Sequence, residues 1–288
     1  MNYGKKFIVE PGSKVRLGKI DPAYSGKHES QESARDETAK ETERMDRLQY
    51  LLYADASQSL LIVLQGLDAA GKDGVIRHLF TGMNPQGTRV YGFKQPSKEE
   101  LAHDFLWRVH RCAPADGEVV IYNRSHYEDV LVVRVHKEVP QSVWSGRYDL
   151  INSFEKFLSE NRTRILKFFL YISPEEQLDR FRQRLDDPAR QWKISDSDYT
   201  ERELWPKYLE AYEEAIERTS TTRAPWYVIP SNHKWFRNLA ISQIIADAMD
   251  DMGLKLPKPR IDLAAIRRKY HAAERQAQSS KSSRRRKS

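Results

Sequence analysis

Residues 66–74 of the chain read Gly66-Leu67-Asp68-Ala69-Ala70-Gly71-Lys72-Asp73-Gly74. An apolar run over residues 59–64 precedes this stretch and predicts a buried strand, and a helical pattern over residues 74–82 follows it. A glycine-rich loop between a strand and a helix is typical of a P-loop, whose backbone N–H groups converge on phosphate oxygens. The helix N-terminus adds partial positive charge and Lys72 adds a full one. The stretch therefore predicts a phosphate site in preference to a glycine-rich turn with a surface lysine.

The loop departs from the commonest P-loop pattern at Asp73, which stands where a serine or threonine hydroxyl usually meets magnesium. Another oxygen must then position Mg²⁺, which prefers oxygen ligands and often bridges to substrate phosphates. Asp68 is the strongest candidate, and the alternative is an aspartate that only forms the turn. We expect the Lys72 side chain to point into a solvent-filled loop. The expected phosphate contacts within the loop are Gly66, Ala69, Ala70, Gly71, Lys72, Asp73 and Gly74.

A second polar cluster follows the predicted strand 118–122, at the strand end where open α/β sheets bind ligands. Arg124 is expected to neutralise a transferring phosphate, and Asn123, Glu128 and Asp129 are candidate metal ligands alongside Asp68. The alternative for the two acids is a helix start, with both carboxylates near its positive end. His126 is a conceivable phosphorylated nucleophile, but a neighbouring hydrogen-bonding role is favoured because P-loop phosphoryl transfer needs no covalent intermediate.

A third cluster is rich in arginine. Helical spacing places Arg180 and Arg184 on one face, and Pro188 then ends the helix. Arg190 and Lys193 follow on a segment that could close over phosphates and exclude water. The open alternative is a solvated, charged helix.

The rest of the chain alternates between helical and strand patterns, which predicts an α/β fold with a parallel sheet covered by helices on both faces. Further predicted strands are 88–93, 118–122, 165–172 and 226–229; further predicted helices are 98–111, 149–160, 174–185, 201–218 and 234–251. We expect three parts: an N-terminal arm (1–40), one P-loop domain (41–255) with a lid at about 178–200, and a basic tail (256–288) that is disordered after a short helix around residues 264–273.

Composition excludes several classes of protein. The apolar runs are far shorter than the roughly 18 residues of a membrane span, and no secretory segment follows the N-terminus. Cys112 is the only cysteine of the chain, which fits a reducing cytoplasm. The net charge is +7, but residues 254–288 carry 12 Lys and Arg against 2 Asp and Glu, so the body is slightly acidic. A nucleic-acid-binding body is therefore not expected.

Four ordered blocks together resemble the family-2 polyphosphate kinases over residues 40–255. They are Gly66-x-Asp68-x-x-Gly71-Lys72-x-Gly74, Asn123-Arg124-Ser125-His126-Tyr127-Glu128-Asp129-Val130-Leu131, Arg184-Leu185-x-x-Pro188-x-x-x-Trp192-Lys193 and Thr219-Ser220-Thr221-x-x-Ala224-Pro225-Trp226. The resemblance implies a thymidylate-kinase-like fold with Mg²⁺ (or Mn²⁺), an arginine-bearing lid, and nucleotide and polyphosphate meeting at the P-loop. It also leads us to expect a homo-oligomer.

Carried over residue by residue, the resemblance places Asp68 and Lys72 in the P-loop and Arg184 and Lys193 in the lid. Asn123 is a departure, because many family members have aspartate there; in this block the chain resembles the subgroup credited with phosphorylating both AMP and ADP.

The expected reaction is transfer of the terminal polyphosphate phosphoryl group to ADP and AMP, reversibly, with Asp68, Lys72, Arg124 and Arg184 as catalytic residues and Arg180 and Lys193 as further phosphate ligands. The alternatives are an ATP-dependent nucleoside-monophosphate kinase and a nucleic-acid-binding protein acting through the basic tail. The preferences between AMP and ADP and between bases, and the physiological direction, stay open.

Overall fold

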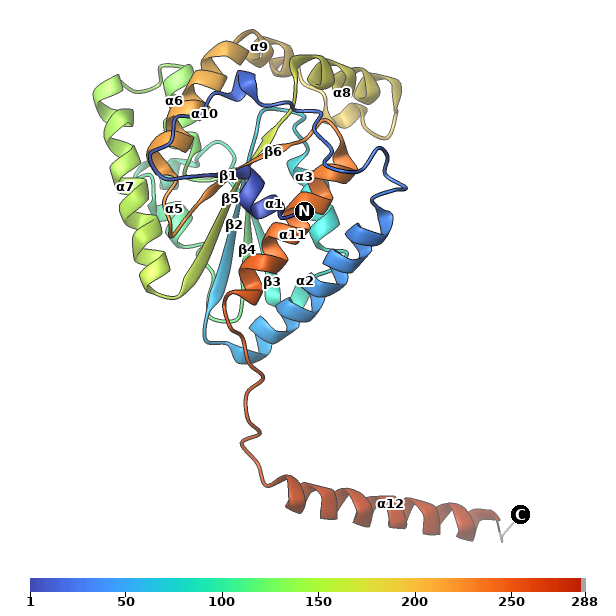
Figure 1. Cartoon of the computed structure of the whole chain (residues 1–288). Coiled ribbons are helices and arrows are strands. Elements are labelled where there is room, and N and C mark those ends of the chain that lie inside the picture. Colours follow the sequence, from blue (N-terminus) through green and yellow to red (C-terminus); the bar gives the residue numbers. More distant parts are fainter. Residues whose placement is uncertain (286–288) are drawn as a thin grey trace. The chain divides into compact units, whose positions relative to one another are not determined.

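The computed structural model describes residues 1–285 (Figure 1), and side chains only as far as residue 278. The chain divides into two compact units, Met1–Lys255 and Leu256–Ser288. The first unit spans both the expected N-terminal arm (1–40) and the expected P-loop domain (41–255). Within the described residues, no helix is long and apolar enough to cross a membrane.

Six strands of the described residues form one sheet with the order β1-β6-β5-β2-β4-β3. They are β1 (Ile8–Val9), β2 (Ser59–Gln65), β3 (Thr88–Gly92), β4 (Val119–Asn123), β5 (Thr163–Tyr171) and β6 (Trp226–Pro230). Only β1 pairs antiparallel, and the other five strands are parallel, which confirms the expected sheet. All residues of β2 are buried, because parallel neighbours flank it and helices cover both of its faces.

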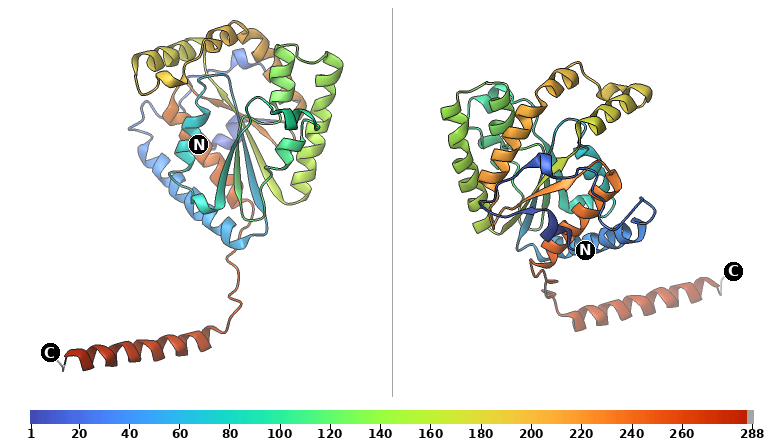
Figure 2. Two further views of the ribbon diagram at one scale, coloured as in Figure 1. Left: turned by 180° about the vertical axis from the view of Figure 1, so that it is seen from behind. Right: turned by 45° about the horizontal axis from the view of Figure 1, so that its top comes forward.

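Helices pack on both faces of this sheet. The helices of the first unit are α1 (Tyr3–Phe7), α2 (Arg35–Asp55), α3 (Lys72–Leu79), α4 (Lys98–Leu101), α5 (Trp107–His110), α6 (Glu128–Val135), α7 (Gln141–Glu160), α8 (Pro174–Asp186), α9 (Ser197–Glu203), α10 (Trp205–Thr219) and α11 (Lys234–Asp250), with short 3-10 turns at Leu17–Lys19, Pro85–Gly87 and Gln191–Lys193. Helices α2, α3 and α11 pack together on one face, and α6, α7 and α10 on the other (Figures 1 and 2).

Two predicted helices are divided in the structure, and a further helix was not predicted. The helix expected over 98–111 is two short helices, α4 and α5, because Asp104 caps the backbone N–H of Leu106 and starts a new turn. The helix expected over 201–218 is likewise divided, into α9 and α10, with Pro206 in the first turn of α10. Helix α6 was not among the predicted helices; its start at Glu128 agrees with the alternative that the two acids begin a helix.

The N-terminal arm is a packed part of the first unit. Tyr3 and Phe7 of α1 are buried and make ring contacts with Phe236 of α11. Strand β1 adds an antiparallel edge to the sheet, and α2 already begins at Arg35, before the expected boundary at residue 40. Two residues are too few to give a strand pattern in a sequence, so β1 left no signal.

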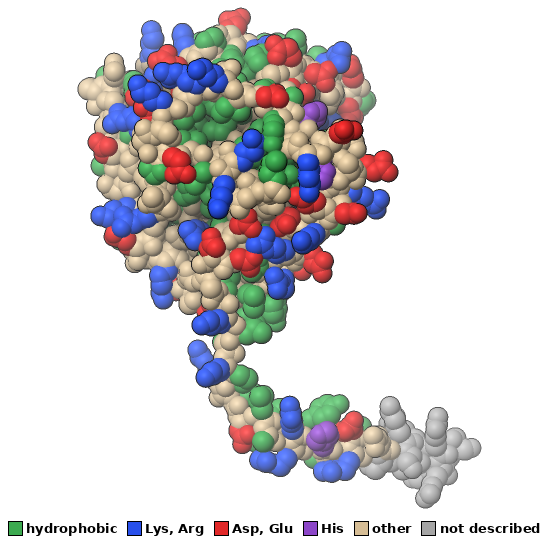
Figure 3. All heavy atoms as spheres, in the orientation of Figure 1, with side chains coloured by type: hydrophobic (Ala, Val, Ile, Leu, Met, Phe, Trp, Pro, Cys, Tyr) green, Lys and Arg blue, Asp and Glu red, His purple; other side chains and the backbone are tan. Residues whose placement is uncertain are grey.

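The unit from Leu256 contains helix α12 (Leu263–Arg285), which includes the short helix expected around residues 264–273 and continues into the part of the tail that we expected to be disordered. Its apolar side chains Leu263, Ile266 and Tyr270 are exposed. The rest of the expected disorder, at residues 286–288, lies outside the described residues. On the face of the first unit seen in Figure 3, basic and acidic side chains are interspersed, as expected for a body that carries no basic surface of its own.

The chain order of the strands creates the place where a site can form. Strand β2 lies between β4 and β5, and the chain leaves its carboxyl end into the 66–71 loop and α3. In the β2–β4 register Leu64 pairs with Asn123, which brings the 123–129 segment beside the loop. The two predicted clusters therefore meet at a topological switch point, where open α/β sheets bind ligands.

Candidate active site

The loop between β2 and α3 has the backbone of a phosphate cradle. Gly66, Ala69 and Gly71 all have positive φ angles, of 155°, 60° and 102°. A Cβ at Gly66 would lie 2.9 Å from the carbonyl oxygen of Leu170, so only glycine fits there. The Lys72 ammonium donates to the carbonyl oxygen of Gly66 at 2.6 Å. The side chain is half-buried and folds over the loop, and burial lowers its pKa.

Arg180 holds this loop from behind. It is 5% exposed, and its Nη1 group donates to the carbonyl oxygens of Ala69 and Ala70 at 2.8 and 2.9 Å. Its Nη2 group donates to two carbonyl oxygens at Ser231 and Asn232, and its Nε to Glu176. An arginine has five N–H groups, and these five bonds use all of them. Arg180 therefore positions the loop and has no donor left for phosphate, which corrects its expected role as a phosphate ligand.

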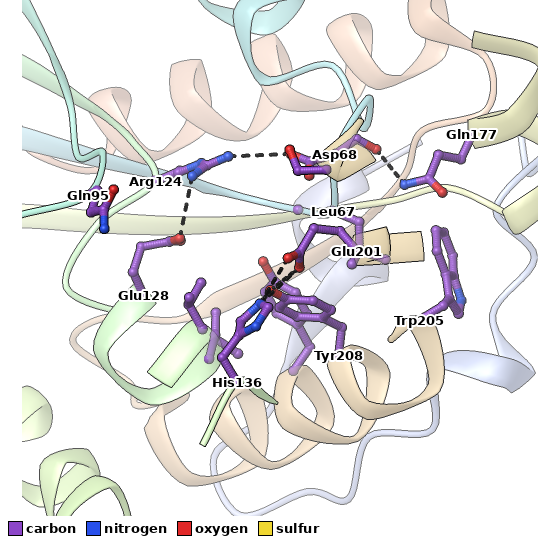
Figure 4. Close-up of a pocket in the computed structure, with 15 residues that line it drawn as sticks. Leu67, Asp68, Gln95, Arg124, Glu128, His136, Gln177, Glu201, Trp205 and Tyr208 are labelled. Carbon is purple, nitrogen blue, oxygen red and sulfur yellow. Dashed lines mark hydrogen bonds and ion pairs between the residues drawn. The ribbon is translucent and has the colours of Figure 1, made fainter. Parts of the chain in front are cut away.

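Arg124 lies between two carboxylates at the mouth of the loop (Figure 4). Its Nη2 atom is 3.4 Å from Oδ1 of Asp68, and its Nη1 atom is 3.9 Å from Oε2 of Glu128. The Arg124 backbone has a φ of 64°, an uncommon conformation for a side chain of this size, and its N–H donates to the carbonyl oxygen of Leu64. The loop after β4 thus turns sharply and aims a cation at the loop after β2.

Of the two carboxylates beside Arg124, that of Glu128 is more buried than that of Asp68. The Glu128 side chain is 16% exposed and accepts a hydrogen bond from Gln65 at 3.0 Å. Burial raises its pKa, and the neighbouring Arg124 charge opposes that rise. Asp68 is 35% exposed, and Gln177 of α8 donates to its backbone carbonyl. Asp68 and Glu128, two of the candidate metal ligands, line the same cavity.

Asp129 is turned away from the site. Its Oδ1 atom lies 3.4 Å from Nη1 of Arg147, and its Oδ2 atom lies 3.9 Å from Nη2 of Arg108. Consecutive residues at a helix start point in different directions, so Glu128 and Asp129 cannot both face the loop. The prediction of Asp129 as a metal ligand was wrong. Burial raises its pKa to about 6.

The lid contacts the first turn of α3. Nζ of Lys193 lies 3.1 Å from Oδ2 of Asp73, while Nδ2 of Asn123 donates to Oδ1 of the same residue at 3.0 Å. Burial alone would raise the pKa of Asp73, but the bonds from Lys193 and Asn123 lower it. Arg184 lies 3.5 Å from Asp198 of α9. Asp73, Asn123 and Lys193 thus meet at one place, although they are far apart in the sequence.

A cavity of about 390 Å³ opens beside Asp68, Arg124 and Glu128. His136, Glu201 and Tyr208 form a hydrogen-bonded group within it (Figure 4): the imidazole lies 3.0 Å from the Glu201 carboxylate, and the Tyr208 hydroxyl donates to that carboxylate at 2.7 Å. These three residues were not predicted, because they come from the end of α6, from α9 and from α10 and form no compact motif in the sequence. Further residues that line the cavity are Gln95, Leu131, Val132, Gln177, Ser197, Trp205 and Tyr212.

A buried polar network anchors the segment that carries Arg124. The Lys167 ammonium donates to Glu155, to the Tyr127 hydroxyl and to the Thr219 carbonyl, at 2.6, 2.9 and 2.7 Å. His126 is fully buried and bonds the same Glu155 at 3.2 Å. Burial lowers the pKa of His126. Its role is the favoured hydrogen-bonding one, since no solvent or substrate reaches the imidazole.

Comparison with known proteins gives concordant matches. A family profile described as "Polyphosphate kinase 2 (PPK2)" matches residues 28–257. The chain is 48% identical to an "AMP/ADP-polyphosphate phosphotransferase" of Meiothermus ruber, over 88% of this chain and 96% of that protein. It is 43% identical to an "ADP-polyphosphate phosphotransferase" of Rhodopseudomonas palustris, over 88% and 92%. The crystal structure of polyphosphate kinase 2 from Arthrobacter aurescens TC1 superposes with a TM-score of 0.91 at 39% identity, covering 94% of this chain and 97% of that one.

Proposed function

Because the chain belongs to the polyphosphate kinase 2 family and is an enzyme of the kinase class, we propose that it transfers the terminal phosphoryl group of inorganic polyphosphate to ADP and to AMP. In this step the terminal P–O–P bond of the polyphosphate breaks and a phosphate oxygen of the nucleotide forms the new P–O bond. The acceptor oxygen is already ionised, so no general base is required. Catalysis then depends on holding two polyanions in line and on stabilising the charge of the transferring group.

The observation that carries this proposal is that the 66–74 loop and the 123–129 segment lie side by side at the carboxyl edge of the sheet. Lys72 and the loop amides supply positive charge from the loop after β2, and Arg124 supplies it from the loop after β4. The Asp68 carboxylate links the two loops, because its Oδ1 atom lies 3.4 Å from Nη2 of Arg124. A phosphoryl group seated on the loop would have cations on two sides. We propose Lys72 and Arg124 as the groups that stabilise it, with Arg184 of the lid as a third.

The acids present at this site fit a magnesium ion that is shared with substrate. Among the described residues, no cluster of three or more His, Cys, Asp or Glu side chains forms a metal cage. Mg²⁺ commonly takes one or two carboxylates and completes its shell with waters and phosphate oxygens. We propose Asp68 and Glu128 as its carboxylate ligands, with the Asn123 amide oxygen as a neutral one. The ion would offset the negative charge that the two polyanions bring together.

The cavity beside Arg124 is our proposed site for the nucleotide. Leu131, Val132 and Trp205 give it apolar and aromatic surface, and the group formed by His136, Glu201 and Tyr208 gives it donors and acceptors. Such a mixture suits a flat, polar-edged base. In this arrangement the phosphates of the nucleotide point toward Asp68 and Arg124, where the loop holds the donor.

The proposal is tested by omitting ATP. Purified protein given ADP, polyphosphate and Mg²⁺ should form ATP, and AMP in place of ADP should yield ADP. Formation of product only when ATP is supplied as donor would instead indicate the nucleoside-monophosphate kinase, the alternative that the family match does not favour.

We propose the cytoplasm as the location and a homo-oligomer as the assembly; cell fractionation and sedimentation velocity check these two points.

A further inference from the structure

Arg237 is a buried cation with no acid to balance it. It lies in the first turn of α11 and is 2% exposed. Its Nε and Nη2 groups donate to Oδ1 of the neutral Asn238, at 3.1 and 2.8 Å, and its Nη1 group lies 3.4 Å from the carbonyl oxygen of Ala70. No carboxylate of the described residues makes an ion pair with it. Burial and the neighbouring Arg180 lower its pKa to about 9.

The guanidinium of Arg237 lies directly against the phosphate loop. A Cβ on Gly71 would collide with its Nη1 atom, and a Cβ on Gly74 would lie 3.2 Å from its Nη2 atom. Gly71 and Gly74 therefore leave the room that the arginine fills. The cation stands behind the loop, on the side of the carbonyl of Ala70, while the amides of the loop face the phosphate.

The surroundings of Arg237 add to the imbalance. Arg180 is equally buried against the same loop and has a single carboxylate, that of Glu176, at 2.6 Å. Lys234 lies one turn before Arg237 and bonds Gln183 at 3.5 Å. Its pKa is lowered by burial and then by Arg180. Arg237 and Arg180 thus lie together against a loop built for anions, and among the described residues only Glu176 forms an ion pair with either of them.

A buried charge without a partner lowers the stability of the folded protein, so we expect a compensating negative charge to bind near it. Packing alone does not account for it, because an uncharged side chain of similar length would fill the same volume without that cost. The nearest place for a compensating charge is the phosphate cradle, on the other side of a single layer of backbone.

We propose that Arg237 acts as an electrostatic positioning residue, whose unpaired charge is balanced by the polyphosphate anion bound on the opposite side of the loop. The inference rests on the proposed function, since it requires an anion in the cradle. Arg237 touches no substrate in this account; it raises the positive potential that the loop amides and Lys72 present. At an effective dielectric constant of about 20, one charge several ångströms from a bound phosphate changes its affinity by about 10- to 100-fold.

The test measures binding and stability without turnover. Inorganic tripolyphosphate is titrated into the protein by calorimetry in the presence of Mg²⁺, and melting temperatures are recorded with and without it. For Arg237→Met we expect affinity to fall about 10- to 100-fold while the ligand-free protein melts at or above the wild-type temperature. Arg237→Lys, which keeps the charge, should bind within about threefold of wild type.

Arg44→Met is the matched control. Arg44 also packs on α11, at its far end, where it pairs with Asp247 and Asp250. Losing it should lower the melting temperature and leave tripolyphosphate affinity unchanged. A structural role for Arg237 would reproduce this control pattern and would overturn the inference.

Glu176→Gln gives an opposite and independent test that does not depend on the folding of the methionine variant. It removes the carboxylate that pairs with Arg180 while leaving an oxygen for Nε of Arg180. We expect tighter tripolyphosphate binding, by about threefold or more, together with a lower ligand-free melting temperature. Unchanged or weaker binding would overturn the inference. Wild-type protein that bound no tripolyphosphate would overturn the proposed function as well, whereas equal binding by wild type and Arg237→Met would overturn this inference alone.

Discussion

The ammonium of Lys72 donates to the carbonyl oxygen of Gly66 at 2.6 Å, so the lysine closes the loop that it follows. The charge is held beside the cradle before any phosphate arrives, and its position costs no rearrangement during the reaction. Burial lowers the pKa of this ammonium, while the charge of nearby Asp68 opposes the change. The lysine is therefore held beside the cradle, where the negative charge of a bound polyanion would stabilise its ammonium.

Lys72→Ala should cut turnover by about 100- to 1000-fold, the scale of one preorganised electrostatic contact. The melting temperature should change little, because the substitution also removes the cost of a partly buried charge. Steady-state kinetics with polyphosphate and ADP, together with a thermal melt, check both parts. Near-normal turnover, or a far lower melting temperature, would make Lys72 a structural residue.

Asp68→Asn should give a folded protein with little activity at millimolar Mg²⁺ and a raised magnesium requirement. Asparagine keeps the size and turn-forming ability of the residue and removes its charge, so it separates metal binding from turn formation. Rates are measured across a magnesium titration. Asp129→Asn is the control, because Asp129 faces Arg108 and Arg147 and should leave the magnesium requirement unchanged. Wild-type behaviour of Asp68→Asn would move the metal to Glu128.

Asp129 should make stability depend on pH below neutrality. Burial raises its folded-state pKa to about 6 from an unfolded value of 3.8, against the opposing charges of Arg147 and Arg108. The folded protein therefore binds the proton more tightly, and the stability this gives is fully present below pH 3.8 and is lost as the pH rises through 6. The melting temperature of wild type relative to Asp129→Asn should rise on going from pH 8 to pH 5. The comparison cancels other titrating groups, such as His126. A difference that does not vary with pH would contradict this assignment.

Deleting residues 260–288 should leave turnover at saturating polyphosphate nearly unchanged. The removed part belongs to a unit of its own and lies entirely outside the 28–257 family match. Its basic charge should matter only for recruiting polyphosphate, so the Michaelis constant should rise at low salt and converge with that of the full chain at high salt. A folded truncation without turnover would refute this. Loss of RNA affinity, with no phosphotransfer in either form, would support the nucleic-acid-binding alternative.

The sequence predicted the parts of the site that lie in continuous motifs. The loop from Gly66 to Gly74 and the segment from Asn123 both follow strands, so their meeting at one sheet edge could be deduced from the alternation of strands and helices. Side-chain direction could not be deduced in the same way. Glu128 and Asp129 are neighbours in the sequence, but helix α6 turns one to the cavity and the other to Arg108 and Arg147.

The hydrogen-bond partners of buried polar side chains could not be predicted from the sequence either. Arg180 appeared as a lid arginine because it shares a helix face with Arg184, yet only the fold reveals four backbone carbonyls around it. Arg237 stood in a predicted helix with no motif around it. The group of His136, Glu201 and Tyr208 comes from three separate helical segments. Residues so far apart in the sequence form no regular spacing from which their contact could be predicted.

The most direct measurement follows the phosphorus atom itself. The protein is incubated with ADP and polyphosphate that carries radiolabelled phosphorus, with Mg²⁺ and no ATP, and the labelled products are separated over time. We expect the label to appear in the terminal phosphate of ATP, at a rate that Lys72→Ala lowers by about 100-fold or more. Label found only as free inorganic phosphate, or in ATP at the same rate with Lys72→Ala, would contradict direct transfer at this loop.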